Sequence, residues 1–407
     1  MLSQYLSKIF IGICYGISFP LTITILDYWL KDLGISNALI GLFSFIHWPF
    51  MLKFLWGPII ENFDIPLLSK KMSRYKSWMT CSYLVLILGI VIMANSNPTT
   101  NVFWLIFGAS LVAIADGCKN IVLYPYQLIG KKEDSVGFIA SCVNLGNRLG
   151  SIFIKVSTLY VAHFFDWRTA YLSAALMIFF VMIINFVIEE PHKNFENRED
   201  FSLKREYLKS FFAPIKQFLE TQDSTKILAI VGLYKSADFM MQKMSRIFCI
   251  EVGFSKIEIA NIIQFYGSIT VIVGSFLGGY AIKKLGLIRS MRFILSLHAI
   301  SFFTYLLLTE FGKENTLLTI IITFEALSGG AVTACFIAFF YTIAADLTIY
   351  AVLWALYELS GLVFMSVSGI FENLLGWRLF FCLVPMLIIP NLVMLRKINT
   401  KKKTSPN

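Results

Sequence analysis

Stretches of about 20 predominantly apolar residues recur along the whole chain, and this recurrence limits the possible folds more than any other feature. Each stretch is long enough to cross the hydrocarbon core of a bilayer as a helix, and lipid favours helices because they satisfy their own backbone hydrogen bonds. The sequence therefore predicts an all-α polytopic membrane protein with about twelve transmembrane helices. The predicted spans are 9–30, 38–59, 77–95, 102–126, 136–162, 169–188, 225–249, 257–282, 290–309, 316–341, 350–372 and 378–396.

The distribution of charge orients these spans. The chain carries a net charge of +10, which could suggest a nucleic-acid partner, but only 15% of its residues are charged and 57% are hydrophobic. With twelve spans, 23 of the 35 lysines and arginines fall in segments on one side and five in loops on the other. Cytoplasmic loops carry such an excess, so we expect both termini in the cytoplasm and no nucleic-acid partner.

The two halves of the chain repeat each other. Leu33-Gly-Ile-Ser-Asn-Ala-Leu-Ile-Gly41 returns as Val252-Gly-Phe-Ser-Lys-Ile-Glu-Ile-Ala260, and each copy offers a serine to cap the next helix. Asp166-Trp-Arg168 before span six likewise returns as Gly376-Trp-Arg378 before span twelve. A duplicated six-helix unit is the plan of the major facilitator fold, with two pseudo-symmetric six-helix bundles.

The predicted domains follow from this repeat. Residues 1–190 form an N-terminal six-helix bundle and 225–397 a C-terminal one. A hydrophilic cytoplasmic linker, 191–224, joins them, and 398–407 is a basic cytoplasmic tail. We expect the chain to function as a monomer in the bilayer.

Several motifs resemble one family within that superfamily. They include Gly16-Ile-Ser-Phe-Pro-Leu21, Leu52-Lys-Phe-Leu-Trp-Gly-Pro58 and Leu233-Tyr-Lys-Ser-Ala-Asp238. These stretches are similar to those of the AmpG muropeptide permeases, and the likeness covers nearly the whole chain apart from the linker and tail. The resemblance implies proton-coupled import of anhydromuropeptides, fragments recycled from the cell wall, across the inner membrane of a bacterium.

Span four departs from the family pattern. The family usually carries two aspartates in a Gln-Asp-Ile-x-x-Asp-Ala-Tyr pattern, whereas this chain has Lys119-Asn-Ile-Val-Leu-Tyr-Pro-Tyr126. Asn120 and Tyr124 thus replace both acids, and neither can exchange a proton at physiological pH. If the acids bind protons or substrate in the relatives, coupling or specificity has changed here.

Spans four and five each present a polar face. Asp116, Asn120 and Tyr124 lie on one face of span four, and Asn144 and Arg148 share a face of span five. Two polar faces on consecutive spans predict the walls of a solute cavity. Asp116 is the candidate to replace the missing acids in proton coupling, paired with Arg148, although a static bridge between these two would fit the pattern equally well.

Charges within spans two and seven extend the predicted site. A charge at membrane depth is costly, so Lys53 in span two would face a cavity and attract an anionic solute, unless it snorkels or pairs with an acid. Span seven carries Lys235, Asp238 and Gln242 on one face. Lys235 and Gln242 are candidate substrate ligands with Asn120, Tyr124, Asn144 and Arg148. Asp238 is a candidate for proton coupling, in a pair with Lys235 that either opens as a gate or stays closed.

Acids in spans ten and eleven are the remaining proton-coupling candidates. A desolvated carboxyl can exchange protons near neutral pH, which favours Glu325 and Glu358. Asp27 and Asp346 lie nearer span ends, where we expect them to be solvated.

The predicted function is therefore secondary transport by alternating access. A different anionic metabolite, such as an acyl-CoA or a nucleotide, would also suit the basic residues, and a transporter-like sensor would fit the loss of the span-four acids. An enzyme is not indicated, because no clustered catalytic motif, phosphate-binding loop or metal-ligand spacing occurs, and we expect no cofactor and no metal.

Overall fold

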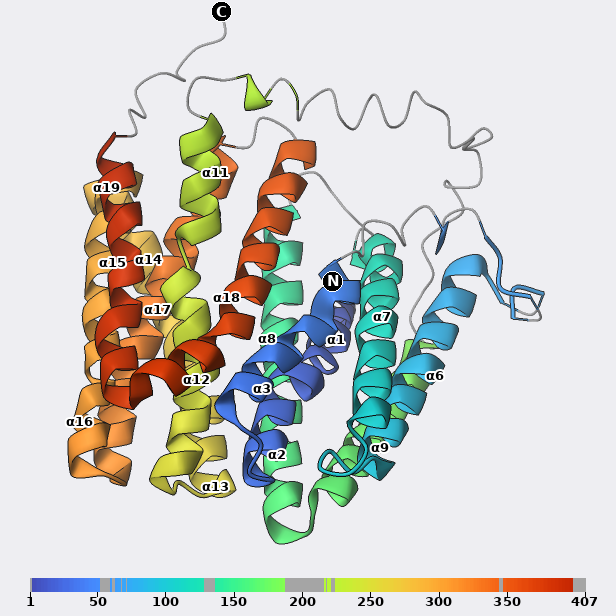
Figure 1. The fold of residues 1–407 in the computed structure, drawn as a ribbon. Coiled ribbons are helices and arrows are strands. Elements are labelled where there is room, and N and C mark those ends of the chain that lie inside the picture. Colours follow the sequence, from blue (N-terminus) through green and yellow to red (C-terminus); the bar gives the residue numbers. More distant parts are fainter. Residues whose placement is uncertain are drawn as a thin grey trace, which may run out of the picture. The chain divides into compact units, whose positions relative to one another are not determined.

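The computed structural model describes residues 2–51, 59–60, 63–66, 68–70, 72–127, 136–186, 216, 218–220, 224–343 and 347–397. All regular elements within these ranges are helical (Figure 1). The tail and most of the linker lie outside the described residues, as do Lys53 and Asp346.

Two compact units divide the chain, one of residues 1–202 with 254–265 and one of 203–253 with 266–407. The bounds of the two bundles, 1–190 and 225–397, remain a prediction. In the first unit the elements are α1 (Leu2–Gly16), η1 (Leu21–Ile25), α2 (Leu26–Asp32), α3 (Asn37–Leu42), η2 (Phe43–His47), α4 (Trp48–Met51), α6 (Arg74–Asn95), α7 (Val102–Gln127), α8 (Val136–Phe164), α9 (Trp167–Asn185) and α13 (Lys256–Glu258), followed by η4 (Ile259–Tyr266) across the boundary. The second unit holds α11 (Ser224–Leu233), α12 (Ser236–Val252), α14 (Gly267–Leu285), α15 (Leu287–Phe303), α16 (Tyr305–Phe311), α17 (Asn315–Ile343), α18 (Leu347–Leu383), η5 (Val384–Ile388) and α19 (Ile389–Lys397).

Eight helical stretches among the described residues are long and apolar enough to cross a membrane. One of them, Val352–Arg396, covers the eleventh and twelfth predicted spans, and Gly376 interrupts it with a φ of 71°. That left-handed backbone suits a glycine at the turn between the two spans. Span five is present as α8, and span seven is split between α11 and α12.

The first span of each half is broken. In the first unit, Ile17 and Ser18 interrupt the helix after α1, and a π-helical segment follows at η1. In the second unit, Tyr234 and Lys235 separate α11 from α12. Broken helices at membrane depth are tolerated where the freed backbone groups find partners or line a cavity. The sequence motifs near both breaks were noted above, but continuous spans were predicted.

Helix pairing also repeats between the units. In the first unit α1 packs on α8, and in the second unit α11 and α12 pack on α18 in the same way. Likewise, α6 packs on α7 in the first unit and α15 packs on α17 in the second. Glycines permit the closest contacts. A Cβ added at Gly146 of α8 would lie 1.9 Å from the Ile9 carbonyl oxygen, and one added at Gly330 of α17 would lie 2.2 Å from the Val271 carbonyl oxygen. Small residues at such crossings let backbones approach, which is how helices associate in lipid.

The two repeated serines differ in their capping. Ser255 forms the predicted capping box with Glu258, in which each side chain accepts from the other residue's backbone N–H. Ser36 stands at the N-cap of α3, but its side chain makes no capping hydrogen bond, so that part of the prediction was wrong. The backbone of Ser36 has the extended conformation typical of an N-cap residue, but its hydroxyl does not accept a hydrogen bond from the helix. The position of the serine in the repeat therefore did not determine whether its side chain caps the helix.

Gly146→Ala is expected to destabilise the first unit, because its new Cβ would overlap the backbone of α1 and force the two helices apart. Overpacking of this kind costs about 1–3 kcal/mol. Thermal unfolding of the purified protein in detergent measures the effect. Gly279→Ala in α14 is the matched control, since nothing lies within 4 Å of its added Cβ. Equal melting temperatures for the two variants would contradict this account of the α1–α8 contact.

Candidate functional site

The break in span seven lies next to a buried charged pair at the start of α12. Ser236 donates to the Leu233 carbonyl oxygen at 2.8 Å, and Ser360 of α18 donates to the Gly232 carbonyl, so the backbone groups freed by the break find partners. Asp238 lies in the first turn of α12, where the helix dipole favours a negative charge. The break therefore supports an acid at a depth where it would otherwise be costly.

Lys235 and Asp238 form the pair that the sequence predicted. The Nζ atom of Lys235 lies 2.6 Å from Oδ2 of Asp238, and the two side chains are 6% and 5% exposed. Lys235 also donates to Oγ1 of Thr333 at 3.1 Å, and Gln242 donates to Oδ2 of Asp238 at 3.1 Å. The pair is thus held within one helix and tied to α17 through Thr333.

A histidine that the sequence analysis did not single out completes this cluster. His298 of α15 places Nε2 3.1 Å from Oδ1 of Asp238 and Nδ1 2.8 Å from Oγ of Ser328. Tyr305 donates to the nearby Glu325 carboxylate, whose charge interacts with those of His298 and Asp238. We call Lys235, Asp238, His298, Ser328, Glu325 and Tyr305 the second-unit network. Its elements are α12, α15, α16 and α17.

A signal for His298 was present in the sequence. The residue lies in the middle of predicted span nine, where an ionisable group is expensive, and the chain has only four histidines. Periodicity places such a residue on a helix face but does not identify its partner on another helix. Asp238 and Ser328 are 60 and 30 residues away along the chain, so the contact became visible only in the fold.

The first unit contains a second buried pair. Asp116 of α7 bonds Nζ of Lys119 through Oδ1 at 2.7 Å, with side chains 2% and 0% exposed. Ser18, in the break of span one, donates to Asp116 and accepts from Lys119. The predicted partner of Asp116 was Arg148, and that prediction was wrong: the remaining oxygen of Asp116 has no hydrogen-bond partner among the described residues. Lys119 is one turn away on the same helix and fills the role.

Other predicted residues lie around these pairs with fewer contacts. The Asn120 carbonyl oxygen accepts from the Tyr15 hydroxyl at 3.0 Å, while its buried side-chain oxygen has no partner among the described residues. Asn144 is exposed, and Arg148 is partly buried on α8. Glu358 accepts from the Trp354 indole at 2.9 Å. The side chain of Tyr124 lies outside the described part of the molecule.

One acid contradicts its prediction. Asp27 was expected to be solvated near a span end, but it is 1% exposed in α2. Beyond the break at Ile17 and Ser18, the first span continues as helix through η1 and α2 to Asp32, so Asp27 lies further from the end of the helix than the apolar pattern indicated.

The repeated Trp-Arg motif makes the same contact in each unit. The Trp167 indole donates to Asp32 at 2.7 Å, and the Trp377 indole donates to Glu251. Asp32 and Glu251 occupy equivalent positions, because each closely precedes the repeated Gly-x-Ser segment. Both tryptophans therefore tie the start of the last span to the end of the first span of the same half, which supports a duplicated unit.

This fold can now be placed among known proteins. A model of the Major Facilitator Superfamily matches residues 9–364. The chain belongs to the Major Facilitator Superfamily.

Superfamily proteins with similar sequences extend over the whole chain. The protein named "Putative transporter AmpG 1" of Rickettsia bellii is 26% identical, covering 98% of this chain and 99% of that protein. AmpG 3 of Rickettsia prowazekii is 28% identical and covers 93% of each chain. The resemblance to the AmpG transporters indicated by the sequence motifs is confirmed.

Solved structures of superfamily transporters share the fold. A peptide transporter of the POT type matches with a TM-score of 0.73 at 12% identity, covering 97% of this chain and 94% of that one. The xylose transporter XylE from E. coli, in an inward-open conformation, matches with a TM-score of 0.67 at 14% identity and covers 99% and 98%. The predicted major facilitator fold is confirmed, and family and fold are those of multi-pass membrane transporters.

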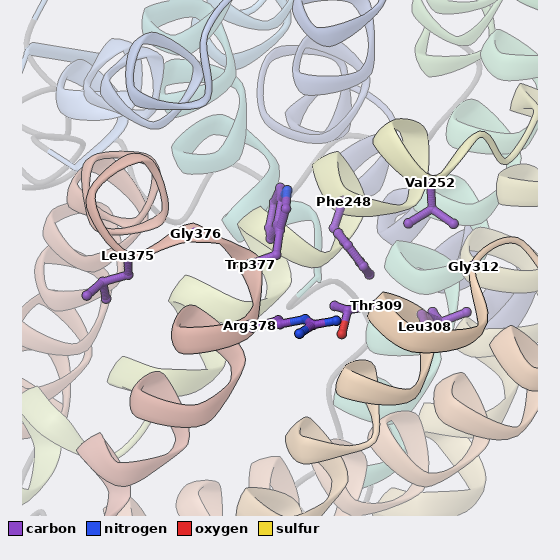
Figure 2. A pocket seen from close by; sticks show the side chains of 9 residues that line it. All are labelled: Phe248, Val252, Leu308, Thr309, Gly312, Leu375, Gly376, Trp377 and Arg378. Carbon is purple, nitrogen blue, oxygen red and sulfur yellow. The ribbon is translucent and has the colours of Figure 1, made fainter.

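A surface pocket of the second unit lies apart from the network. It has a volume of about 550 Å³ and is lined by nine residues around the turn at Gly376 (Figure 2). Arg378 is the charged residue of this lining, and Glu310 already neutralises it at 2.9 Å. None of the predicted site residues lines this pocket, so it does not continue the buried network.

Asp116→Asn is expected to destabilise this superfamily member strongly, because it leaves the Lys119 ammonium buried without its carboxylate. Breaking a buried pair in this way costs about 3–5 kcal/mol. The double variant Asp116→Asn/Lys119→Met removes the stranded charge and is expected to recover most of the loss. Thermal unfolding in detergent distinguishes the three proteins. A double variant as unstable as the single one would show that the pair is not what stabilises this site.

Proposed function

We propose that the chain is a proton-coupled importer of anhydromuropeptides that works by alternating access in a bacterial inner membrane, with both termini in the cytoplasm. The observation that carries the proposal is the second-unit network, in which a buried lysine, aspartate and histidine and a partly buried glutamate lie together beside a broken span. Buried ionisable groups within a membrane protein mark substrate or proton pathways, and the similar AmpG proteins are named as transporters.

Proton coupling falls to the second unit in this proposal. The two acids of the family pattern in span four are absent here, and Asp116 is bound to Lys119 within its own helix. Asp238 and Glu325 instead belong to a network that joins four elements, so a proton gained or lost there changes contacts between helices. Movement between packed helices is what alternating access requires.

The solute would be recognised by polar groups that the fold leaves available. Anhydromuropeptides carry carboxylates and amide groups, which suit a basic side chain such as Lys235 or Arg148 and acceptors such as the side-chain oxygen of Asn120. The partners of Lys235 include Asp238, Thr333 and Tyr357, and an anionic solute could replace one of these contacts. Lys53, Tyr124, Asn144 and Gln242 remain proposed solute ligands, and Glu358 a proposed proton carrier.

Uptake of labelled anhydromuropeptide into proteoliposomes, with and without an inward proton gradient, tests the proposal. The wild-type protein is expected to show gradient-stimulated uptake. Asp238→Asn and Glu325→Gln are each expected to reduce uptake to its gradient-free level, because each removes a carboxylate from the network in which the proton is exchanged. The amide oxygen in Glu325→Gln can still accept from Tyr305, so this variant tests proton coupling even if Asp238→Asn does not fold.

Asp64→Asn is the matched control for this measurement. Asp64 is exposed and pairs with Arg74 at 2.6 Å outside the spans, where the guanidinium hydrogen bond lowers the pKa of the carboxyl. This variant should transport as the wild type does. If folded, inserted wild-type protein takes up no anhydromuropeptide, the substrate assignment is wrong. Another anionic metabolite or a sensor without transport would then take its place.

A further inference from the structure

The imidazole of His298 meets an oxygen at each of its nitrogens. Nε2 lies 3.1 Å from a carboxylate oxygen of Asp238, and Nδ1 lies 2.8 Å from the hydroxyl of Ser328, with Ser301 further away at 3.5 Å. The residue is 1% exposed, and its ring packs on Phe302 at 4.4 Å between centroids. The side chain is therefore fixed in orientation with both nitrogens engaged.

This environment satisfies the ring in both of its protonation states. A carboxylate only accepts, so Nε2 carries a hydrogen in either state. When the ring is neutral, the Ser328 hydroxyl donates to Nδ1. When the ring is cationic, Nδ1–H donates to Ser328, whose hydroxyl turns to the Phe324 carbonyl oxygen 2.7 Å away. One hydroxyl rotation therefore accommodates the gain or loss of a proton at Nδ1.

The charges facing His298 explain what that proton would change. Asp238 and Lys235 face the ring from α12, and Glu325 faces it from α17. Arg246 of α12 interacts with Glu325. Tyr305 of α16 is bound to Glu325.

Elements α14, α18 and α19 also pack against α15, which carries His298. Tyr357 of α18 is hydrogen-bonded to Lys235 and also interacts electrostatically with Asp238 and Glu358. The lysines of α14, Lys283 and Lys284, and the last described arginine of α19, Arg396, are exposed at helix ends.

We propose that His298 is the proton-exchanging residue of this transporter and that its protonation releases Lys235 for the solute. The proton binds the lone pair at Nδ1 on the side of uptake and leaves the same nitrogen on the side of release. The inference rests on the proposed proton-coupled transport and assigns its proton carrier.

The geometry of Asp238 makes the coupling direct. Its Oδ1 faces His298 and its Oδ2 faces Lys235 and Gln242. A cationic ring makes a charge-assisted hydrogen bond to Oδ1, which weakens the hold of the carboxylate on Lys235. Lys235 keeps neutral partners in Thr333 and Tyr357, and its charge becomes available to an anionic solute. A bound anion in turn balances the added proton, so proton and anion favour each other's binding.

Nuclear magnetic resonance of ring-labelled histidine in the purified protein tests the titration without any solute. The chain has four histidines, and the His298→Gln variant assigns the signal. The proposal requires this signal to change between the neutral and cationic forms when the pH of the sample is varied between about 5 and 8, the physiological range in which a histidine switch acts. In Asp238→Asn the change is expected at lower pH, since the imidazolium loses its carboxylate. A His298 signal that stays in one form across this range would overturn the proposal.

Transport by His298→Gln separates coupling from solute binding. In proteoliposomes this variant is expected to lose gradient-driven accumulation of anhydromuropeptide while retaining exchange of labelled for unlabelled solute without a gradient. His163→Gln is the matched control, because His163 is exposed at the end of α8 and should keep both activities.

Each other outcome overturns a distinct claim. Accumulation by His298→Gln at the wild-type level contradicts the proton role, and so does loss of exchange in folded protein, which would place His298 in solute binding or packing. If the wild type neither accumulates nor exchanges anhydromuropeptide, the proposed function fails, and the resonance titration still decides whether His298 exchanges a proton.

Discussion

A charge buried within a membrane-spanning helix must be paired, and both units of this protein meet that requirement with a lysine and an aspartate three residues apart. The pairs are Asp116–Lys119 on α7 and Lys235–Asp238 at the start of α12. Each pair lies beside the break in the first span of its half. In the first unit Ser18, at the break, bonds both members of the pair, and in the second unit Lys235 is itself at the break. Pairing lowers the cost of burial, and the break supplies polar backbone groups at the same depth.

The duplication preserved the framework more closely than the charges. Equivalent helices pack on one another in both units, and Trp167 and Trp377 make equivalent bonds to acids at the ends of the first spans. The residue at the break in span one is the neutral Ser18, whereas the break in span seven contains the charged Lys235. The first unit therefore takes its charges from another span, and its pair is not a copy of the pair in the second unit.

Predictions from the sequence were confirmed where the feature depends on residues close together in the sequence. Apolar length predicted the spans, the repeated motifs predicted the duplicated fold, and the spacing of Lys235 and Asp238 predicted their pair. Spacing failed where the outcome depended on a second element. The spacing predicted Arg148 as the partner of Asp116 and predicted no partner for His298. A polar face shows in which direction a side chain points, but it does not identify the residue that another helix places there.

The two pairs differ in what could open them, and this difference favours the second unit as the place of coupling. Asp116 and Lys119 lie within one unbroken helix, and relative movement of helices leaves their separation unchanged. Among the described residues, Ser18 is the hydrogen-bond partner that links them to another element. Lys235 is the N-cap residue of α12 and Asp238 lies in its first turn, so this pair stands at the end of a helix, next to the break from α11. His298 and Thr333 attach the same pair to α15 and α17. A change of protonation there alters bonds among three helices at once, whereas in the first unit it would act mainly within one.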